Sequence, residues 1–314
     1  MTPDIAVTRR AVWVGMLLYP RHTLPTAAAP VAVAVGLAAH DGLLAPGPAL
    51  AAFVAGWLIQ LGGVITDNYH NLTRHPDDEE HALFIEALRL GVVTLRELRR
   101  AIYACYLGAA VVGTYLVYVG GLPVVVIGLA SAAASLAYSS KPLPLGDHGL
   151  GDPLFFVFFG PVSVVASYYV QAAATLASSW PLTPPAGSVT GPALAAGLAV
   201  GALTTNILLV DNIRDRDYDR SKGERTLAVI IGPGWTRIEY AVLLAFAYLV
   251  PLWFWLRAGF GPAALLPLLS LPYGLLVARR VWQARTHEAL IPMSPQAGQV
   301  LLAYSFLFAL GVAR

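Results

Sequence analysis

Apolar runs long enough to cross a bilayer recur along almost the whole chain. A transmembrane helix needs about 20 mainly apolar residues to cross about 30 Å of hydrocarbon. Nine runs approach this length, at residues 24–43, 48–67, 101–119, 121–139, 153–178, 190–210, 236–256, 259–278 and 296–313. The pattern predicts an all-α polytopic membrane protein, a nine-transmembrane-helix bundle that forms a single domain over residues 1–314.

The basic residues set the expected orientation of this bundle. All of them except Arg257 and Arg314 precede the first run, or lie in or beside the links that follow the second, fourth, sixth and eighth runs. The links after the other runs are short and almost free of Lys and Arg. Because these residues accumulate on the cytoplasmic side of a membrane, we expect a cytoplasmic N-terminal segment over residues 1–20 and four cytoplasmic links. The C-terminus is expected on the far side.

The composition indicates the same class of protein. Hydrophobic residues make up 57% of the chain and charged residues 12%, whereas a soluble domain carries about 25% charged residues. The mean hydropathy is +0.65. The composition therefore excludes an ordinary soluble protein and makes the lipid bilayer the expected partner, with no nucleic acid.

A dense block of charge, residues 211–226, directly follows the sixth run. Asp211, Asp215 and Asp219 are four residues apart, so on a helix they share one face. Like charges placed in this way repel one another unless a cation lies between them. Mg²⁺ is the natural candidate, because it takes carboxylate and phosphate oxygens. Four basic side chains nearby offer donors to the same phosphates: Arg214, Arg220, Lys222 and Arg225.

A second acidic cluster lies at the end of the second run. Asp67 and Asn71 share a helix face, Asn68 follows Asp67 directly, and Pro76 is expected to end the helix just before Asp77. A carboxylate at membrane depth is costly, which makes Asp67 a candidate functional residue. Two acidic clusters on one side of the membrane are what a two-sided metal clamp requires.

The two other cytoplasmic links differ from these acidic segments. The link over residues 139–152 is rich in Gly and Pro and contains one permanent cation, Lys141. Its glycines allow close backbone approach to a ligand, so Lys141 is expected to contact a diphosphate, with interfacial snorkelling as the alternative. The last link, residues 279–296, is basic without an acidic cluster and is expected to act as a topological anchor.

At these residues the sequence resembles the UbiA superfamily of intramembrane aromatic prenyltransferases, most closely its menaquinone branch, the 1,4-dihydroxy-2-naphthoate polyprenyltransferases. The stretches that carry the resemblance are residues 21–30, 67–77, 138–171 and 211–228. The most specific is Asn212-Ile-Arg-Asp215, followed by Gly223-Glu-Arg-Thr-Leu-Ala228. The resemblance implies a nine-helix bundle of the UbiA type, with two Asp-rich motifs that hold Mg²⁺ on a prenyl diphosphate near the cytoplasmic side.

The resemblance also assigns roles by position. The expected metal ligands are Asp67, Asn71, Asp77, Asp211, Asp215 and Asp219. The five aspartates among them are also the expected catalytic residues. The expected contacts to the diphosphate are Asn68, Asn71, Tyr138, Lys141, Arg214, Lys222 and Arg225. The first motif departs from the family pattern, because its usual Asn-Asp-x-x-Asp is here Asp67-Asn68-x-x-Asn71. One acid is thus transposed and another is replaced by a neutral amide.

The implied function is Mg²⁺-dependent transfer of a polyprenyl group, geranylgeranyl or longer, from an allylic diphosphate to an aromatic acceptor. The expected acceptor is 1,4-dihydroxy-2-naphthoate in menaquinone biosynthesis, at the cytoplasmic side of a prokaryotic plasma membrane. The altered first motif keeps open another acceptor or a membrane terpene cyclase, and a non-catalytic prenyl-diphosphate-binding protein is a further alternative. A transporter is disfavoured, because transporters place polar groups at the bilayer midplane.

Overall fold

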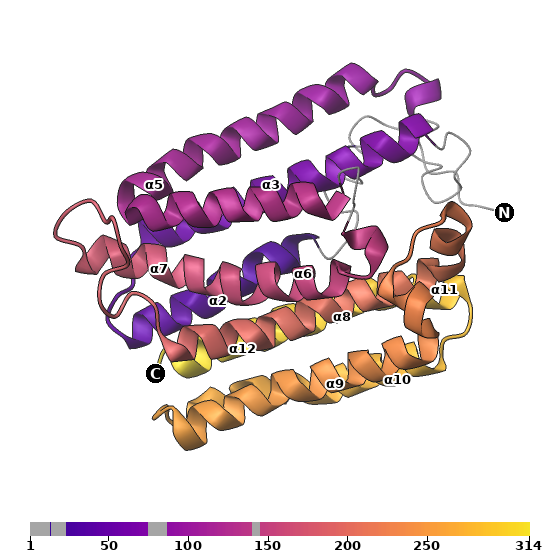
Figure 1. Ribbon diagram of the computed structural model, residues 1–314. Coiled ribbons are helices and arrows are strands. Elements are labelled where there is room, and N and C mark those ends of the chain that lie inside the picture. The colour runs from indigo at the N-terminus through magenta and orange to yellow at the C-terminus, as the bar shows by residue number, and fades with distance from the viewer. Residues whose placement is uncertain (1–12, 14–22, 75–86, 140–144) are drawn as a thin grey trace.

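The computed structural model describes residue 13 and residues 23–74, 87–139 and 145–314. Within these residues the regular structure is helical, without strands. The elements are α2 (Thr23–His40), α3 (Pro46–Arg74), α5 (Leu95–Ser139), η2 (Gly146–His148), α6 (Gly151–Val157), η3 (Phe158–Val162), α7 (Ser163–Leu176), α8 (Gly191–Lys222), α9 (Leu227–Arg257), η4 (Pro262–Ser270), α10 (Leu271–Gln283), α11 (His287–Leu290) and α12 (Met293–Val312). The long helices lie side by side in one bundle, with α11 at one end and the C-terminus at the other (Figure 1).

Seven helical spans in the described part of the chain are long and apolar enough to cross a membrane. One of them, Leu95–Ala134, contains two helices divided at Gly121, where φ is 68° and ψ is −154°. Glycine is required there, because a Cβ atom would collide with the carbonyl oxygen of Pro181. α2 is also apolar but shorter. The all-helical membrane architecture is therefore confirmed, while the count of nine crossings stays a prediction.

The charged block after the sixth run continues α8 instead of forming a loop. Thr190 caps the start of this helix, where its Oγ1 accepts a hydrogen bond from the backbone N–H of Ala193 (3.2 Å). Gly223 ends the helix in a left-handed conformation, with φ at 81°. No residue between these ends breaks the helix, so all three aspartates of the block are helical.

α8 packs closely against the segment formed by α6 and η3. A Cβ atom on Gly160 of η3 would lie 2.5 Å from the carbonyl oxygen of Gly197 and from the Cα atom of Gly201, both on α8. Small residues let membrane helices approach in this way. The contact fixes α6 beside the last turns of α8, where the charged block lies.

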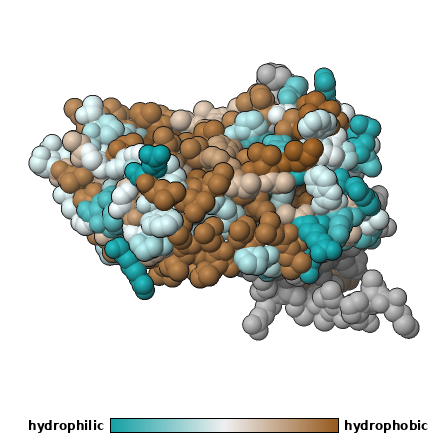
Figure 2. Space-filling view, turned by 90° about the horizontal axis from the view of Figure 1, so that it is seen from below, coloured by the Kyte–Doolittle hydropathy of each residue, from teal (hydrophilic) through white to brown (hydrophobic). Residues whose placement is uncertain are grey.

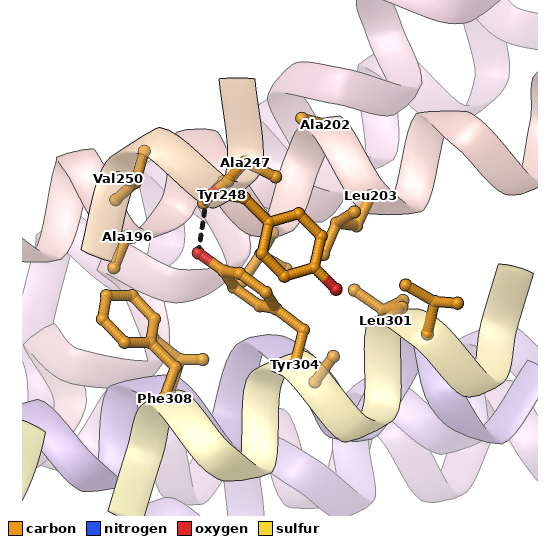
Figure 3. Packing of buried hydrophobic residues seen from close by; sticks show 14 of the residues in the cluster. Ala196, Ala202, Leu203, Ala247, Tyr248, Val250, Leu301, Tyr304 and Phe308 are labelled. Atoms are coloured by element: carbon orange, nitrogen blue, oxygen red, sulfur yellow. Dashed lines mark hydrogen bonds between the residues drawn. The ribbon is translucent and has the colours of Figure 1, made fainter. Parts of the chain in front are cut away.

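Aromatic side chains fill the core where α8, α9 and α12 meet (Figure 3). Tyr304 of α12 packs edge-on against Tyr248 of α9, with ring centroids 5.3 Å apart. Its hydroxyl donates to the carbonyl oxygen of Ala247 (2.8 Å), so this polar group is satisfied inside the bundle. Phe308 and Leu203 complete the packing around these rings.

The start of α9 is tied to the end of α10 by a buried arginine. α9 bends at Gly232, and the Arg237 side chain lies just after this bend. Arg237 Nε donates to the carbonyl oxygen of Val281 (3.0 Å), Nη2 to that of Ala284 (2.7 Å) and Nη1 to that of Pro233 (3.1 Å). Three satisfied donors hold the bend in one position.

The surface has the polarity of a membrane-spanning bundle. Figure 2 shows apolar residues across the middle of one face, with polar residues gathered toward its two ends. Large apolar side chains of α9 are exposed, among them Val242 and Leu249. Contiguous exposed apolar surface of this extent is expected where lipid, not water, surrounds the helices.

Candidate functional site

The last turns of α8 place three carboxylates along one side of the helix. Asp211 and Asp215 are partly exposed, whereas Asp219 is buried. Their spacing of four residues puts them on one face, as predicted, because the helix continues without interruption to Lys222. The arrangement is a ladder of hard oxygen ligands at the end of an apolar helix.

A guanidinium group lies between the first two carboxylates. Arg214 Nη1 is 2.9 Å from Asp211 Oδ1. The same side chain binds Asp215 in a bidentate manner, with Nε 2.7 Å from Oδ1 and Nη2 2.6 Å from Oδ2. Such forked contacts are among the strongest ion pairs in proteins. In this structure, Arg214 therefore supplies the positive charge that the carboxylates need.

The turn after α8 returns to the third carboxylate. The left-handed Gly223 allows the chain to reverse, and the backbone N–H of Glu224 donates to the carbonyl oxygen of Asp219 (3.0 Å). Thr226 Oγ1 then donates to Asp219 Oδ2 (3.2 Å). This geometry gives the Gly-x-Arg-Thr sequence a physical role, since it orients Asp219.

Two other cations of the block, Lys222 and Arg225, lie at and just after the end of α8. The Lys222 ammonium lies over the ring of Tyr218, 3.8 Å from its centroid. Arg225 is exposed. Both are at the end of the bundle where the expected diphosphate would bind, and their contact with it stays a prediction.

Two residues of the last predicted cytoplasmic link also contact the carboxylates. Ser294 Oγ at the start of α12 donates to Asp211 Oδ2 (3.2 Å). His287 Nδ1 of α11 lies 3.9 Å from Asp215 Oδ1 and 3.4 Å from the carbonyl oxygen of Arg214. The sequence assigned this link to topological anchoring and missed both contacts; the only signal was the polar run beginning at Thr286.

On another face of α8, Asn212 connects the block to α6. Its Nδ2 donates to Oδ1 of Asp152, whose side chain is 2% exposed. A second acid, Glu239 of α9, interacts electrostatically with Asp152. No role was predicted for Asp152 or Glu239, because neither belongs to an acidic cluster along the chain.

A further polar residue lies deeper in α8. Asn206 is 1% exposed, and neither its Oδ1 nor its Nδ2 has a hydrogen-bond partner among the described residues. Burial of an amide without hydrogen bonds in an apolar core costs free energy of folding. Its position just over one turn before Asp211 makes it a candidate for contact with a bound molecule.

The first acidic motif lies largely beyond what the structure describes. Asp67, Asn68 and Asn71 belong to α3, as predicted, but the positions of their side chains are outside the description. Asp77 and Lys141 are outside the described residues altogether, and so is the side chain of Tyr138, near the end of α5. The expected two-sided clamp therefore stays a prediction.

The donor atoms of the second acidic motif, Asp211, Asp215 and Asp219, are of the type that binds a hard divalent ion. Its donors are carboxylate oxygens, which Mg²⁺ and similar ions prefer. Among the residues that the structure describes, no group of three or more His, Cys, Asp and Glu side chains is arranged to hold a metal ion. A metal at this end of the bundle would need the carboxylates to turn from Arg214, or ligands from the first motif.

Known proteins share both the sequence and the fold of this chain. The sequence profile of the UbiA prenyltransferase family matches residues 27–293. A 1,4-dihydroxy-2-naphthoate octaprenyltransferase of Escherichia coli (strain K12) is 30% identical over 98% of this chain and 96% of its own. A protein of the same name from Mycobacterium tuberculosis (strain ATCC 25618 / H37Rv) is also 30% identical, over 91% of this chain and 92% of its own.

The fold comparison agrees with the sequence comparison. The solved apo structure of a UbiA homolog from Aeropyrum pernix K1 superposes with a TM-score of 0.66, covering 90% of this chain and 96% of its own. The two sequences are 20% identical, so this likeness shows the shared fold. The carboxylate ladder of α8, the apolar bundle and these relatives lead to one conclusion: the chain belongs to the UbiA prenyltransferase family and is an integral membrane prenyltransferase.

Proposed function

We propose that this enzyme transfers a polyprenyl group from an allylic prenyl diphosphate to 1,4-dihydroxy-2-naphthoate. The observation that carries the proposal is the ladder of Asp211, Asp215 and Asp219 on α8, with Arg214 between the first two. A membrane helix that ends in carboxylates and a guanidinium suits a metal-bound diphosphate on an apolar tail. The acceptor is the one named for the two bacterial relatives.

Mg²⁺ is the proposed metal. The residues that would hold it are Asp67, Asn71, Asp77, Asp211, Asp215 and Asp219. When bound, it supplies Lewis-acid stabilisation of the leaving diphosphate. Asn68, Tyr138, Lys141, Arg214, Lys222 and Arg225 are the proposed contacts that orient the diphosphate.

Arg214 has one set of partners without substrate, the carboxylates, and another with substrate, the diphosphate oxygens. Without substrate, it neutralises Asp211 and Asp215, which would otherwise repel each other. When substrate binds, Asp211 and Asp215 would hold the metal, and Arg214 would pair with the diphosphate oxygens, for which its planar fork is suited. The exchange keeps the charge of the site balanced in both states.

The chemistry follows from the placement of these charges. The C–O bond of the prenyl diphosphate breaks, and the diphosphate leaves with the electron pair, stabilised by the preorganised cations. The allylic cation forms among apolar side chains, where exclusion of water prevents its hydrolysis. The naphthoate ring then forms a C–C bond at the carbon that bears the carboxylate. The carboxylate leaves as CO₂, and the electron pair of the broken bond restores the aromatic ring.

The proposal extends to the whole chain and its place in the cell. Residues 1–314 form one domain in a prokaryotic plasma membrane, with the N-terminus and the active site cytoplasmic, because the basic links lie at that side. The isoprenoid is geranylgeranyl or longer.

One feature supports a second candidate function. The first motif contains Asn71 where the family pattern has an acid, which lowers the charge available for a metal. A site weakened in this way fits a different aromatic acceptor or a terpene cyclase, in which the allylic cation is trapped within the same molecule.

Product analysis separates these functions. The purified protein in nanodiscs is supplied with geranylgeranyl diphosphate, Mg²⁺ and 1,4-dihydroxy-2-naphthoate, and the products are identified by mass spectrometry. We expect a prenylated naphthalene that has lost the mass of CO₂. A cyclised hydrocarbon formed without acceptor would support the cyclase and overturn the transferase.

A further inference from the structure

The link between α10 and α12 packs against the last turns of α8. It contains the short helix α11, which contacts α8 at one end of the bundle (Figure 1). Thr286 caps this helix, where its Oγ1 accepts a hydrogen bond from the backbone N–H of Ala289 (3.3 Å). Leu290, the last residue of α11, is 3% exposed and belongs to the main core. The link is therefore a packed part of the fold.

Contacts at both ends fix the position of this link. At its start, Arg237 Nη2 donates to the carbonyl oxygen of Ala284 (2.7 Å). At its end, Ser294 Oγ donates to Asp211 Oδ2 (3.2 Å). With both ends held, His287 between them has a defined place beside the charged block of α8.

His287 brings its ring to the pair formed by Arg214 and Asp215. Its Nδ1 lies 3.4 Å from the carbonyl oxygen of Arg214 and 3.9 Å from Oδ1 of Asp215. Both of these oxygens are hydrogen-bond acceptors, so the geometry places a hydrogen on Nδ1. The side chain of His287 is 47% exposed, so a small movement of the ring does not disturb the core.

Asp215 needs another donor under the proposed function. Without substrate, its two oxygens accept from Arg214 at 2.7 and 2.6 Å. When Arg214 pairs with the diphosphate, Asp215 loses both of these hydrogen bonds. A donor at 3.9 Å has to approach by about 1 Å to reach a hydrogen-bond length of about 2.9 Å. His287 can then hold one oxygen of Asp215 and leave the other for a metal ion.

Two other roles fit these contacts less well. Direct binding of the metal through Nδ1 would require a lone pair on that nitrogen, but it faces two acceptors and carries a hydrogen. Mg²⁺ also prefers oxygen ligands. A role in the stability of the substrate-free fold would be small, because contacts between exposed charged groups contribute little.

We propose that His287 is a positioning residue that holds Asp215 for metal binding once Arg214 pairs with the diphosphate. Hydrogen bonds from surrounding residues orient the carboxylates that bind metals, and His287 supplies such a bond from outside both Asp-rich motifs. This inference rests on the proposed function, because it concerns the metal-diphosphate of that reaction. It places the link after α10, which was expected only to anchor the topology, in the active site.

The first test compares metal requirements. His287→Ala removes the donor, whereas His287→Asn keeps an N–H group near the position of Nδ1. We expect the Mg²⁺ concentration for half-maximal activity to rise about 10-fold or more in His287→Ala and less than about 3-fold in His287→Asn. The KM for the aromatic acceptor should stay within about 2-fold of the wild type in both variants. Glu288→Gln changes an exposed neighbour in α11 and is the matched control, with an unchanged Mg²⁺ requirement.

The second test needs no turnover. Inorganic diphosphate with Mg²⁺ is the probe, because a ligand that binds the folded state raises the thermal unfolding midpoint. Without the probe, we expect the wild type, His287→Ala and His287→Asn to unfold at similar midpoints in nanodiscs, because Arg214 then holds Asp215. With the probe, the midpoint should rise less in His287→Ala than in the wild type or in His287→Asn.

The outcomes separate this inference from the proposed function. In an active enzyme, an unchanged Mg²⁺ requirement in His287→Ala overturns the role of His287 alone. Equal losses in His287→Ala and His287→Asn do the same, because the donor is then irrelevant. So does a lower midpoint of His287→Ala without the probe combined with an undiminished rise on adding it, since that pattern indicates a structural role.

Failure of the proposed function gives a different result. A wild-type protein that prenylates no acceptor overturns that function. A rise in midpoint with Mg²⁺ and diphosphate that depends on His287 would still support the place of this residue at a metal-diphosphate site.

Discussion

Arg214 holds Asp215 in a bidentate ion pair, with Nε 2.7 Å from Oδ1 and Nη2 2.6 Å from Oδ2. The guanidinium also reaches Asp211, so one cation serves two of the three carboxylates in the ladder. Under the proposed function, a divalent ion held by these carboxylates would compete with this arginine for the same oxygens. Binding of a metal-diphosphate would then be linked to release of Arg214.

This competition predicts how an Arg214→Ala variant responds to metal. Without Mg²⁺, loss of the guanidinium removes the ion-pair partner that two partly buried carboxylates share, which we expect to lower the free energy of unfolding by about 1–3 kcal/mol. Mg²⁺ should restore more stability to the variant than it adds to the wild type. Thermal unfolding in nanodiscs, with EDTA or with Mg²⁺, measures both effects. An equal Mg²⁺ response of the two proteins would contradict the competition.

The contact between Thr226 and Asp219 predicts a role in metal binding. Thr226→Val removes the hydroxyl that donates to Asp219 Oδ2 but keeps the size of the side chain. A hydrogen bond to a charged group contributes about 1.5–3 kcal/mol, so we expect activity to need at least about 10-fold more Mg²⁺. Thr226→Ser keeps the donor and serves as the control. Equal Mg²⁺ requirements of Thr226→Val and Thr226→Ser would remove this contact from the account.

Ser294 links the start of α12 to the carboxylate ladder. Ser294→Ala removes the donor to Asp211 Oδ2, and residues that orient metal ligands typically affect affinity or activity by about 10-fold to 100-fold. We expect a decrease in kcat/KM for the prenyl diphosphate near the lower end of this range. Ser305→Ala, in the same helix, is the control, because Ser305 lies about three turns away in the apolar core. A similar loss in both variants would point to disturbed packing of α12.

Asn206 predicts an opposite effect on stability and activity. Both of its amide atoms are buried without partners among the described residues, and replacing such a group by an apolar one of similar shape can be stabilising. We expect Asn206→Leu to raise the thermal unfolding midpoint and to lower the rate of prenyl transfer. A variant with full activity would show that this amide has no part in binding substrate.

Much of the fold was predictable because length and polarity determine what can cross a membrane. The run at residues 190–210 predicted α8, and the spacing of Asp211, Asp215 and Asp219 predicted their common face. The helix extends 12 residues beyond the predicted run, to Lys222, because hydropathy marks where a helix leaves the bilayer and not where it ends. Gly223 supplies the actual stop.

The side-chain contacts of the site could not be predicted in the same way. The approach of Ser294 to Asp211 joins residues 83 positions apart, and that of Asn212 to Asp152 joins residues 60 apart. Neither pair has a signal in local periodicity. The ion pairs of Arg214 with Asp211 and Asp215 were not predicted either, because Arg214 was interpreted as a contact to phosphate.

Diphosphate release by an Asp215→Asn variant is the measurement to make first. Asp215 is a proposed metal ligand, and in the absence of metal it forms an ion pair with Arg214. Asp217→Asn, which alters an exposed acid two residues away, is the matched control. With geranylgeranyl diphosphate, Mg²⁺ and 1,4-dihydroxy-2-naphthoate, we expect Asp215→Asn to lose at least about 100-fold in rate while its thermal unfolding shows a folded protein. Asp217→Asn should stay within about 2-fold of the wild type. Wild-type rates in a folded Asp215→Asn variant would contradict the account.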